Sequence, residues 1–389
     1  MTSIFFAESS RNLGGQELQL LQQATGLRAK GFEPRVLCRP DSRIAQEARK
    51  LGLAVEHLGF RNALHPPSVV KLTQLLRKHR PVAVVCHSGH DSNLCALTVH
   101  ALARLNLLNP RPSLIRMRTY QVGSAKAFTY NQLFDQTFTP SKALKDQLLQ
   151  NSGVLPEKIG VLYPGVDFQG IERDAEQTAL PASLMSTLSD MARRPVIVHA
   201  AMFRLEKGHS FMLNVVKALL PQFPGLTYIA AGEGELREAV AEEARRLGIA
   251  DHVVLPGMLN PVAPLIARAD VLVMPSSYEP LGMSQIEALG LGVPVVVSQV
   301  GGLPETVVDG QTGWVCPAPH AAGAQAAWVQ TLTAVLADPV AARQRAQVGK
   351  ETVQAQFGRN SNLDGLIGLI GQISNLDLKR LGHSPRRHG

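Results

Sequence analysis

Short apolar runs alternate along this chain with longer stretches in which apolar residues recur at helical spacing. Such alternation is typical of an α/β fold, in which helices join the strands of a parallel sheet. In the first half it predicts a helix that opens at Gly14-Gly15 and ends near Lys30. It also predicts strands at 4–7, 36–38, 82–86, 114–117 and 136–139.

A second alternation follows residues 168–194, which are polar, lack periodicity and predict a linker. Beyond them the pattern predicts strands at 196–200, 226–231, 252–255, 271–274 and 293–297, and helices at 208–220, 234–247 and 284–291. We therefore expect two doubly wound, Rossmann-like domains that face each other across a cleft. Ligands of such sheets bind at the carboxyl ends of the strands, where the loops converge.

The length of 389 residues also favours two domains over a single core. We expect an N-terminal Rossmann-like domain at 1–175 and a C-terminal Rossmann-like domain at 190–350. A C-terminal helix within 351–378 is expected to pack back toward the N-terminal domain. Residues 379–389 are polar and basic and predict a flexible tail.

The net charge of +8 is concentrated in the first half of the chain. Residues 1–150 hold 20 Lys and Arg against 9 Asp and Glu, whereas residues 151–389 hold 19 against 22. A basic half suggests an anionic partner. An anionic membrane leaflet or a phosphorylated, lipid-linked acceptor fits better than nucleic acid, and a solvated basic face without a partner is the alternative.

The four cysteines lie far apart and show no metal-binding spacing, which predicts free thiols in a reducing compartment and no metal site. The apolar start of the chain is interrupted at once by Glu8, so no signal peptide is predicted. The most apolar stretch, 211–232, contains Lys217, Pro221 and Pro224 and does not predict a membrane span. We expect a cytoplasmic protein.

Segment 278–288 carries the most informative chemistry. It follows an apolar strand and leads directly into a helix. Pro280 and Gly282 predict a tight loop whose backbone comes close to a ligand, and the amides that open the next helix favour an anion. Glu279 and Glu287 flank this phosphate cradle as carboxylates that can accept hydrogen bonds from sugar hydroxyls.

Two further loops follow strands in the same way. Arg204 and Lys207 come directly after the strand at 196–200, where two cations can neutralise a diphosphate leaving group. Gly14-Gly15 opens the first helix of the other domain and brings its amides toward the same cleft. Each signal alone has an ordinary alternative, such as a solvated helix start or a simple turn, and their joint order supports the functional interpretation.

Several segments together resemble glycosyltransferase family four, whose members are retaining enzymes of the GT-B architecture. The resemblance covers nearly the whole chain. It rests on the pair Glu279 and Glu287 and on four further motifs: Gly14-Gly15-Gln16-Glu17, Arg204-x-x-Lys207-Gly208-His209, Ala231-Gly232-Glu233-Gly234 and Val300-Gly301-Gly302-Leu303-Pro304-Glu305. The Gly-Gly-Gln-Glu opening resembles bacterial members that build lipopolysaccharide or other surface polysaccharides.

The resemblance implies a role for each matching residue. Glu279 resembles the glutamate beside the transferred sugar, and Glu287 resembles the one that binds the ribose hydroxyls. Arg204 and Lys207 resemble the pair that binds the diphosphate in place of a metal. The remaining donor-binding residues that it implies are Gly14, Gly15, Gly257, Met258, Leu281, Gly282 and Met283.

The chain departs from the family pattern in two places. Met202 stands where many members have an arginine, so Arg204 takes that role from a shifted position. Several relatives have a histidine after the strand at 114–117, and this chain has none there. The candidates on the acceptor side are Asp91 for catalysis, with helix capping as an equal alternative, and His87, His90, Arg116, Arg118 and Lys126 for acceptor or anion binding.

The sequence thus predicts a retaining glycosyltransferase that uses a nucleotide-sugar donor and needs no cofactor. Its expected acceptor is a lipid-linked or polysaccharide chain of the bacterial envelope, at the cytoplasmic face of the inner membrane. The alternatives are a nucleotide-sugar epimerase or hydrolase of the same fold, and a non-catalytic sugar-nucleotide-binding or membrane-binding protein. Nucleic acid is not an expected partner.

Overall fold

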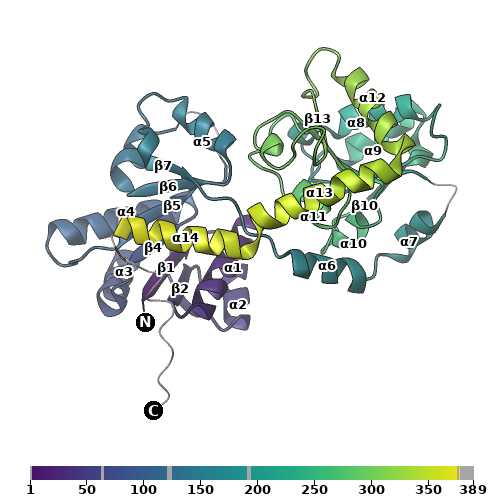
Figure 1. Cartoon of the computed structure of the whole chain (residues 1–389). Coiled ribbons are helices and arrows are strands. Elements are labelled where there is room, and N and C mark those ends of the chain that lie inside the picture. The colour runs from purple at the N-terminus through teal and green to yellow at the C-terminus, as the bar shows by residue number, and fades with distance from the viewer. Residues whose placement is uncertain (1, 63–64, 121–124, 191–193, 375, 377–389) are drawn as a thin grey trace. The chain divides into compact units, whose positions relative to one another are not determined.

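A computed structural model describes residues 2–62, 65–120, 125–190, 194–374 and 376. The chain divides into two units (Figure 1): unit 1 comprises Met1–Gly165 and Arg359–Gly389, and unit 2 comprises Val166–Gly358. The predicted tail at 379–389 lies outside the described residues.

Unit 1 is built on a parallel sheet of seven strands among the described residues, in the order β3-β2-β1-β4-β5-β6-β7. The inner strands are buried on both faces, so their sequences are almost continuously apolar. The strands are β1 (Ser3–Glu8), β2 (Glu33–Cys38), β3 (Ala54–His57), β4 (Ala83–Cys86), β5 (Ser113–Met117), β6 (Gln136–Thr139) and β7 (Ile159–Val161).

Helices cover both faces of this sheet. One core lies between the sheet and α1, α2 and α14, and a second core lies between the sheet and α3 and α4. The helices of unit 1 are α1 (Gly15–Ala29), α2 (Arg43–Lys50), α3 (Pro66–His79), α4 (Gly89–Arg104), α5 (Lys142–Leu149) and α14 (Arg359–Ser374), with helical turns at Thr129–Leu133 and Pro156–Lys158.

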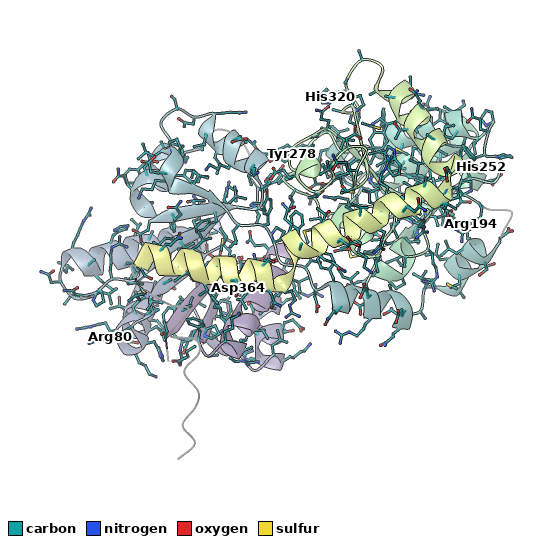
Figure 2. All side chains as sticks on the ribbon, viewed as in Figure 1. Arg80, Arg194, His252, Tyr278, His320 and Asp364 are labelled. Atoms are coloured by element: carbon teal, nitrogen blue, oxygen red, sulfur yellow. The ribbon has the colours of Figure 1, made fainter. Side chains whose placement is uncertain are left out.

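The C-terminal helix α14 is fastened to α1 by a buried amide. Asn362 Oδ1 accepts hydrogen bonds from Gln19 Nε2 and Gln23 Nε2, both at 3.1 Å. Asn362 Nδ2 donates to the carbonyl of Tyr163 at 2.6 Å. Asp364, labelled on α14 in Figure 2, adds an ion pair at 2.9 Å with Lys30, the residue that follows α1. These contacts explain why the chain returns to unit 1 at its end.

Unit 2 repeats the design with six parallel strands among its described residues, in the order β10-β9-β8-β11-β12-β13. Its core centres on the fully buried rings of Tyr228 and Trp328. The strands are β8 (Val196–Ala200), β9 (Thr227–Ala231), β10 (Val253–Gly257), β11 (Val271–Met274), β12 (Val295–Ser298) and β13 (Trp314–Cys316).

The helices of unit 2 again lie on both sides of its sheet (Figure 1). They are α6 (Phe168–Gln177), α7 (Ala182–Ser189), α8 (His209–Leu219), α9 (Arg237–Leu247), α10 (Ala263–Ile266), α11 (Ser284–Gly290), α12 (Ala324–Ala337) and α13 (Pro339–Phe357). Among the described residues, no helix is both long enough and apolar enough to span a membrane. All four cysteines are buried free thiols.

The linker predicted at 168–194 is wrong for the part that the structure describes, because α6 and α7 form there. Phe168 packs its ring against Gly290 of α11, where a Cβ would collide with it. Glu172 pairs with Lys350 of α13 at 2.7 Å. The polar composition of the segment conceals these helices, because α6 buries few apolar side chains, among them Phe168 and Ala175.

Candidate functional site

The order of the strands in the unit 2 sheet reverses direction between β8 and β11, and we call this point the reversal of the sheet. From β8 the chain continues to β9 and β10 on one side, whereas β11 to β13 build the other side. Ligands of open α/β sheets bind at such a reversal, beyond the carboxyl ends of the strands. The loops that follow β8 and β11, residues 201–208 and 275–283, therefore define the candidate site.

Gly208 allows these two loops to touch. Its φ is +76°, and a Cβ at this position would collide with the carbonyl oxygen of Pro275. Glycine adopts this left-handed conformation without steric cost and leaves room for the carbonyl. The backbone N–H of Ser277 donates to the carbonyl of Glu206 at 2.8 Å, which joins the loops directly.

Lys207 and Glu279 form an ion pair that links the two loops. Lys207 Nζ lies 2.5 Å from Glu279 Oε2, and the side chains are only 18% and 10% exposed. Because water is largely excluded, the attraction between these charges is stronger than that of a surface pair. An ammonium group has three N–H donors, and Glu279 is the only described residue that accepts from this one.

Arg204 precedes Lys207 in the same loop, at the start of a helical turn (Leu205–Lys207). Its side chain is exposed and, within the part of the chain that the structure describes, makes no ion pair. The structure therefore places both predicted cations on one loop, with Lys207 held in position by a carboxylate and Arg204 directed to solvent.

The loop after β12 supports Glu279 from behind. Gly301 has a φ of +53°, and a Cβ there would collide with the carbonyl oxygen of Glu279. The N–H of Gly302 donates to that same carbonyl at 3.0 Å. The Gly301-Gly302 pair is thus explained by the close approach of two backbones, which fixes where the Glu279 side chain begins.

Glu287 lies in α11 and is partly buried. Burial raises the pKa of its carboxyl group from 4.5 to about 7, because removal from water disfavours the charged form. Among the described residues, no side chain or amide donates a hydrogen bond to this carboxylate. A shielded carboxyl group without a protein partner is suited to bind the hydroxyl groups of a ligand.

The other predicted donor-binding residues of unit 2 lie at the same edge of its sheet. Leu281 is buried, whereas Gly282 and Met283 are more open and lead into α11. Gly257 ends β10 with a φ of +83°, and Met258 after it is 63% exposed. Since all strands of this sheet are parallel, the residue at the end of β10 shares an edge with the loops after β8 and β11.

Unit 1 has the equivalent reversal between β1 and β4. The predicted pair Gly14 and Gly15 lies there, at the start of α1, and both residues are exposed. Glu17 Oε2 accepts a hydrogen bond from the N–H of Gly14 at 2.8 Å, which is the glutamate half of a capping box. The glutamate of the Gly-Gly-Gln-Glu motif therefore has a structural role in beginning the helix.

The sequence analysis missed Glu8, which ends β1 at this reversal and is fully buried. Its carboxylate accepts hydrogen bonds from the N–H of Ser10 at 2.8 Å, from Gln16 Nε2 at 2.7 Å and from the hydroxyl of Ser88. Gln16 Oε1 in turn accepts from Thr119 Oγ1 at 2.8 Å. The available signal is an acidic residue at the end of an apolar strand.

Asp91 is placed as a helix cap, which corrects its selection as a catalytic candidate. The helix α4 begins at Gly89 and not near Asn93, and Asp91 is fully buried in its first turn. Its carboxylate accepts from the backbone N–H groups of His87, Ser88 and Ser92 at 3.2, 3.1 and 2.6 Å. Burial nevertheless raises its pKa well above the usual value. With these oxygens turned to the backbone, the structure favours the capping alternative.

The two histidines of this loop differ. His87 is buried, stacks on Phe6 and lies with Nδ1 3.1 Å from the carbonyl of Ala7. Burial lowers its pKa, so the neutral ring is favoured. His90 is exposed at the start of α4. Of the two, only His90 is open to a ligand in the way that an acceptor-binding role requires.

Arg116 does not lie on a surface, which corrects its place among the anion-binding candidates. It is only 8% exposed, and its guanidinium lies over the rings of Tyr130 and Phe134, 5.3 and 5.7 Å from their centroids. Such cation–π contacts partly compensate for lost hydration, and burial lowers its pKa. Arg118 is half-buried and Lys126 is exposed.

Two family models match this chain in succession. The model "Glycosyltransferase Family 4" matches residues 13–169, and the model "Glycosyl transferases group 1" matches residues 189–353. The chain belongs to glycosyltransferase family four. The second match contains the whole candidate site of unit 2. The first contains Gly14, Gly15 and the loop that follows β4 in unit 1.

Known members of the glycosyltransferase family align with parts of the chain. Glycogen synthase of Mycobacterium tuberculosis is 34% identical over 180 residues, which are 43% of this chain and 41% of that protein. The lipopolysaccharide core biosynthesis glycosyltransferase LpsE of Rhizobium meliloti is 30% identical over 183 residues, 47% of this chain and 52% of that protein. The matched region thus spans about half the length of these relatives.

A solved structure of Anabaena HepE in complex with UDP shares the fold of this glycosyltransferase. It superposes with a TM-score of 0.78 at 18% identity and covers 96% of this chain and all of the other. Two Rossmann-like domains with sheets of seven and six described strands agree with the GT-B architecture. The predicted α/β fold class and family are therefore confirmed.

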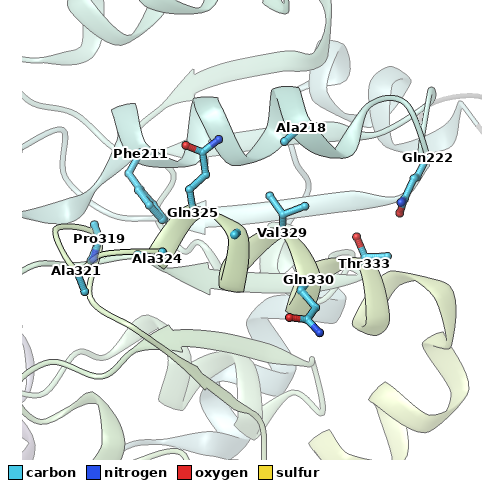
Figure 3. A pocket seen from close by; sticks show the side chains of 12 residues that line it. Phe211, Ala218, Gln222, Pro319, Ala321, Ala324, Gln325, Val329, Gln330 and Thr333 are labelled. Carbon is cyan, nitrogen blue, oxygen red and sulfur yellow. The ribbon is translucent and has the colours of Figure 1, made fainter.

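One pocket of this glycosyltransferase lies away from the candidate residues. Figure 3 shows a cavity of ≈ 870 Å³ between α8 and α12, lined by side chains such as Phe211, Gln325 and Val329. None of its lining residues is charged, and none is a predicted site residue. It offers no cation for a diphosphate, so the reversal loops remain the candidate site.

Proposed function

We propose that this protein is a retaining glycosyltransferase that moves a sugar from a nucleoside-diphosphate sugar to a lipid-linked or saccharide acceptor. The donor binds to unit 2 and the acceptor to unit 1. The observation that carries this proposal is the shielded pair of Lys207 and Glu279 at the reversal of the unit 2 sheet. The complex of HepE with UDP supports a nucleoside diphosphate as the ligand class.

In this proposal each group has one task at the donor. Lys207 uses its remaining N–H donors, and Arg204 its guanidinium, to bind the diphosphate without a metal. The amides of Leu281, Gly282 and Met283 bind diphosphate and sugar. Glu287 accepts hydrogen bonds from the ribose hydroxyls. The base packs at Gly257-Met258, where an exposed thioether offers apolar surface.

Transfer breaks the bond between the anomeric carbon and the diphosphate oxygen and forms a bond from that carbon to the acceptor hydroxyl. Attack occurs on the face that the diphosphate leaves, so the configuration is retained. The acceptor proton passes to a diphosphate oxygen. The cations stabilise the negative charge that develops on the leaving group, which lowers the barrier, while Glu279 lies beside the sugar and holds Lys207.

The proposed class of acceptor rests on the charge of the first half of the chain and on sequence similarity. The first 150 residues carry a surplus of Lys and Arg, which suits an anionic acceptor or leaflet. The similarity to LpsE supports a role in lipopolysaccharide or exopolysaccharide synthesis. We place the enzyme in the bacterial cytoplasm, peripherally at the inner membrane, with exposed His90 and Lys126 among the groups open to an acceptor.

The test begins with thermal-shift screening against UDP, ADP and GDP and their sugars, since a ligand that binds the native state raises the melting temperature. Transfer from the selected donor to lipopolysaccharide core and lipid-linked acceptors is then followed by NMR of the anomeric proton. Lys207→Ala should lower kcat/KM about 100-fold or more. Lys217→Ala, which removes an exposed lysine of α8, is the matched control and should not change kcat/KM.

Each contrary outcome would indicate a different function or mechanism. An inverted product anomer would refute the retaining mechanism. Free sugar as the only product would indicate a hydrolase, and an epimerised nucleotide sugar an epimerase. Nucleotide binding without turnover of any acceptor would leave a non-catalytic binding protein. Unchanged activity in Lys207→Ala would refute the proposal that Lys207 and Arg204 form a clamp for the diphosphate.

A further inference from the structure

Three buried polar side chains lie next to the loop that carries Arg204 and Lys207. His199 is in β8, Tyr228 is in β9 and His209 is the first residue of α8, and none is more than 3% exposed. His199 Nδ1 lies 2.7 Å from Tyr228 Oη, which lies 3.4 Å from His209 Nδ1. The two imidazoles are stacked with centroids 4.1 Å apart.

The end of this chain of contacts is a backbone carbonyl of the loop. His209 Nε2 lies 3.1 Å from the carbonyl oxygen of Met202, which also accepts from the N–H of Arg204 at 2.9 Å. On its other side, His209 stacks on Phe203 with centroids 4.3 Å apart. The histidine therefore contacts two successive residues of the loop, one through a hydrogen bond and one through its ring.

The partners determine where the hydrogens lie. A carbonyl only accepts, so the Nε2 of His209 must carry its hydrogen, and the Nδ1 of the neutral ring is an acceptor. The hydroxyl of Tyr228 then donates to that Nδ1 and accepts from the Nδ1–H of His199. This assignment uses every donor and leaves one acceptor, the buried Nε2 of His199, without a partner in the described residues.

The surroundings keep both rings neutral. Burial, together with the nearby charge of Lys207, lowers the pKa of His199, and burial lowers the pKa of His209 to about 4. Two protonated rings could not stack at this distance, and a protonated His209 would lose its acceptor for Tyr228. The network is therefore uncharged at neutral pH.

We propose that His209 is a positioning residue, which holds Met202 and the turn after it so that Lys207 and Arg204 meet the donor diphosphate. Tyr228 and His199 fix the ring of His209 from the core. The loop is otherwise held mainly through its backbone, by hydrogen bonds such as those of Phe203 to Glu233 and of Ser277 to Glu206. The side chains of Met202, Arg204 and Leu205 are exposed, so the ring of His209 is the side chain that fixes the carbonyl of Met202 from the core. This inference rests on the proposed function, in which Lys207 binds the diphosphate.

Two substitutions separate the hydrogen bond from the ring. The side-chain amide of glutamine reaches the place of Nε2, whereas that of asparagine reaches only the place of Nδ1. His209→Gln should therefore keep the donor to Met202 and bind UDP within about twofold of the wild type, and His209→Asn should weaken UDP binding about tenfold. Both variants lose the ring, so each controls for the other. Isothermal titration with UDP, or with ADP if the screen selects it, gives the affinities.

A double-mutant cycle tests whether the effect passes through Lys207. In a Lys207→Ala background, His209→Asn should weaken nucleotide binding by less than about twofold, because the group that it positions is gone. If Lys207→Ala alone leaves the affinity unchanged, the proposed clamp fails. If Lys207→Ala weakens binding but His209→Asn does not, only the positioning role fails.

Three other results would also overturn the positioning role. The first is an equal loss of UDP affinity in His209→Asn and His209→Gln. The second is a loss of binding free energy in the double-mutant cycle that is fully additive. The third is a lower kcat of His209→Asn in the transfer assay with its nucleotide affinity unchanged. Should His209→Asn fail to fold, Tyr228→Phe removes only the hydroxyl that orients the ring. It should weaken UDP binding about threefold, the effect of one neutral hydrogen bond, and an unchanged affinity would refute the proposal.

Discussion

The ionised carboxyl group of Glu287 should lower the free energy of unfolding, and the Glu287→Gln variant should show by how much. The folded state raises the pKa of this carboxyl group from 4.5 to about 7 through burial alone. One pKa unit corresponds to about 1.4 kcal/mol, so the full shift amounts to about 3 kcal/mol against folding once the group is ionised in both states. Glu287→Gln removes the charge and keeps the shape.

The sign follows from proton binding. Between pH 4.5 and about 7 the folded protein holds the Glu287 proton while the unfolded chain has released it. Stability from this group is therefore fully present below 4.5, falls as the pH rises through about 7, and is constant above that. Relative to Glu287→Gln, the wild type should lose about 2–3 kcal/mol between pH 5 and pH 8.

Urea unfolding of both proteins at these two pH values measures the difference. We expect Glu287→Gln to be the more stable protein at pH 8, with nearly equal stabilities at pH 5, and to have lost most of its transfer activity. Such a gain in stability with a loss of activity is typical of a group retained for function. Equal pH dependence in both proteins would show that the carboxyl group is hydrated or paired in solution, which would refute the reasoning.

Two further substitutions test the loops. Asp91→Ala should lower the free energy of unfolding by about 1–3 kcal/mol, because three backbone N–H groups lose their acceptor; thermal unfolding checks this, and lost activity at unchanged stability would restore a chemical role for Asp91. Gly208→Ala should destabilise by more than about 2 kcal/mol through collision with Pro275. Gly248→Ala has a similar φ of +72° and open space around it, so it should cost only about 1 kcal/mol, and equal losses would show that the loop contact is unimportant.

The sequence predicted the inner strands of both sheets well, for a physical reason. Strands buried on both faces are mostly apolar, and β8 and β11 have the bounds that the pattern indicates. The strand β6 also has its expected bounds, although three of its four residues are polar. The short edge strands β3 and β13 are only partly buried and carry no such run.

The sequence predicted where candidate residues lie when the backbone decides their placement, but not when burial decides it. Lys207 and Glu279 follow adjacent parallel strands, so the sheet topology alone brings their loops together. Arg116 and Asp91 also follow or end strands, yet both are buried and used within the fold. A charged residue near a strand end has the same appearance in sequence whether it faces a ligand or the core, and only the packed structure distinguishes the two cases.

The two reversals of this chain show how the same topology is used with opposite electrostatics. In unit 2 the carboxylate of Glu279 is neutralised by Lys207. In unit 1 the carboxylate of Glu8 is fully buried, and its donors among the described residues are uncharged groups of Ser10, Gln16 and Ser88. A buried anion without a cation repels other anions. Two arginines of the basic first half nevertheless lie at the loop after β1: Arg11 pairs with Asp41 at 3.3 Å, and Arg39 Nε donates to the carbonyl of Ser9 at 2.7 Å. We therefore expect neutral hydroxyl groups of an acceptor to be better suited to Glu8 itself, and an anionic portion to be bound by the basic residues around it.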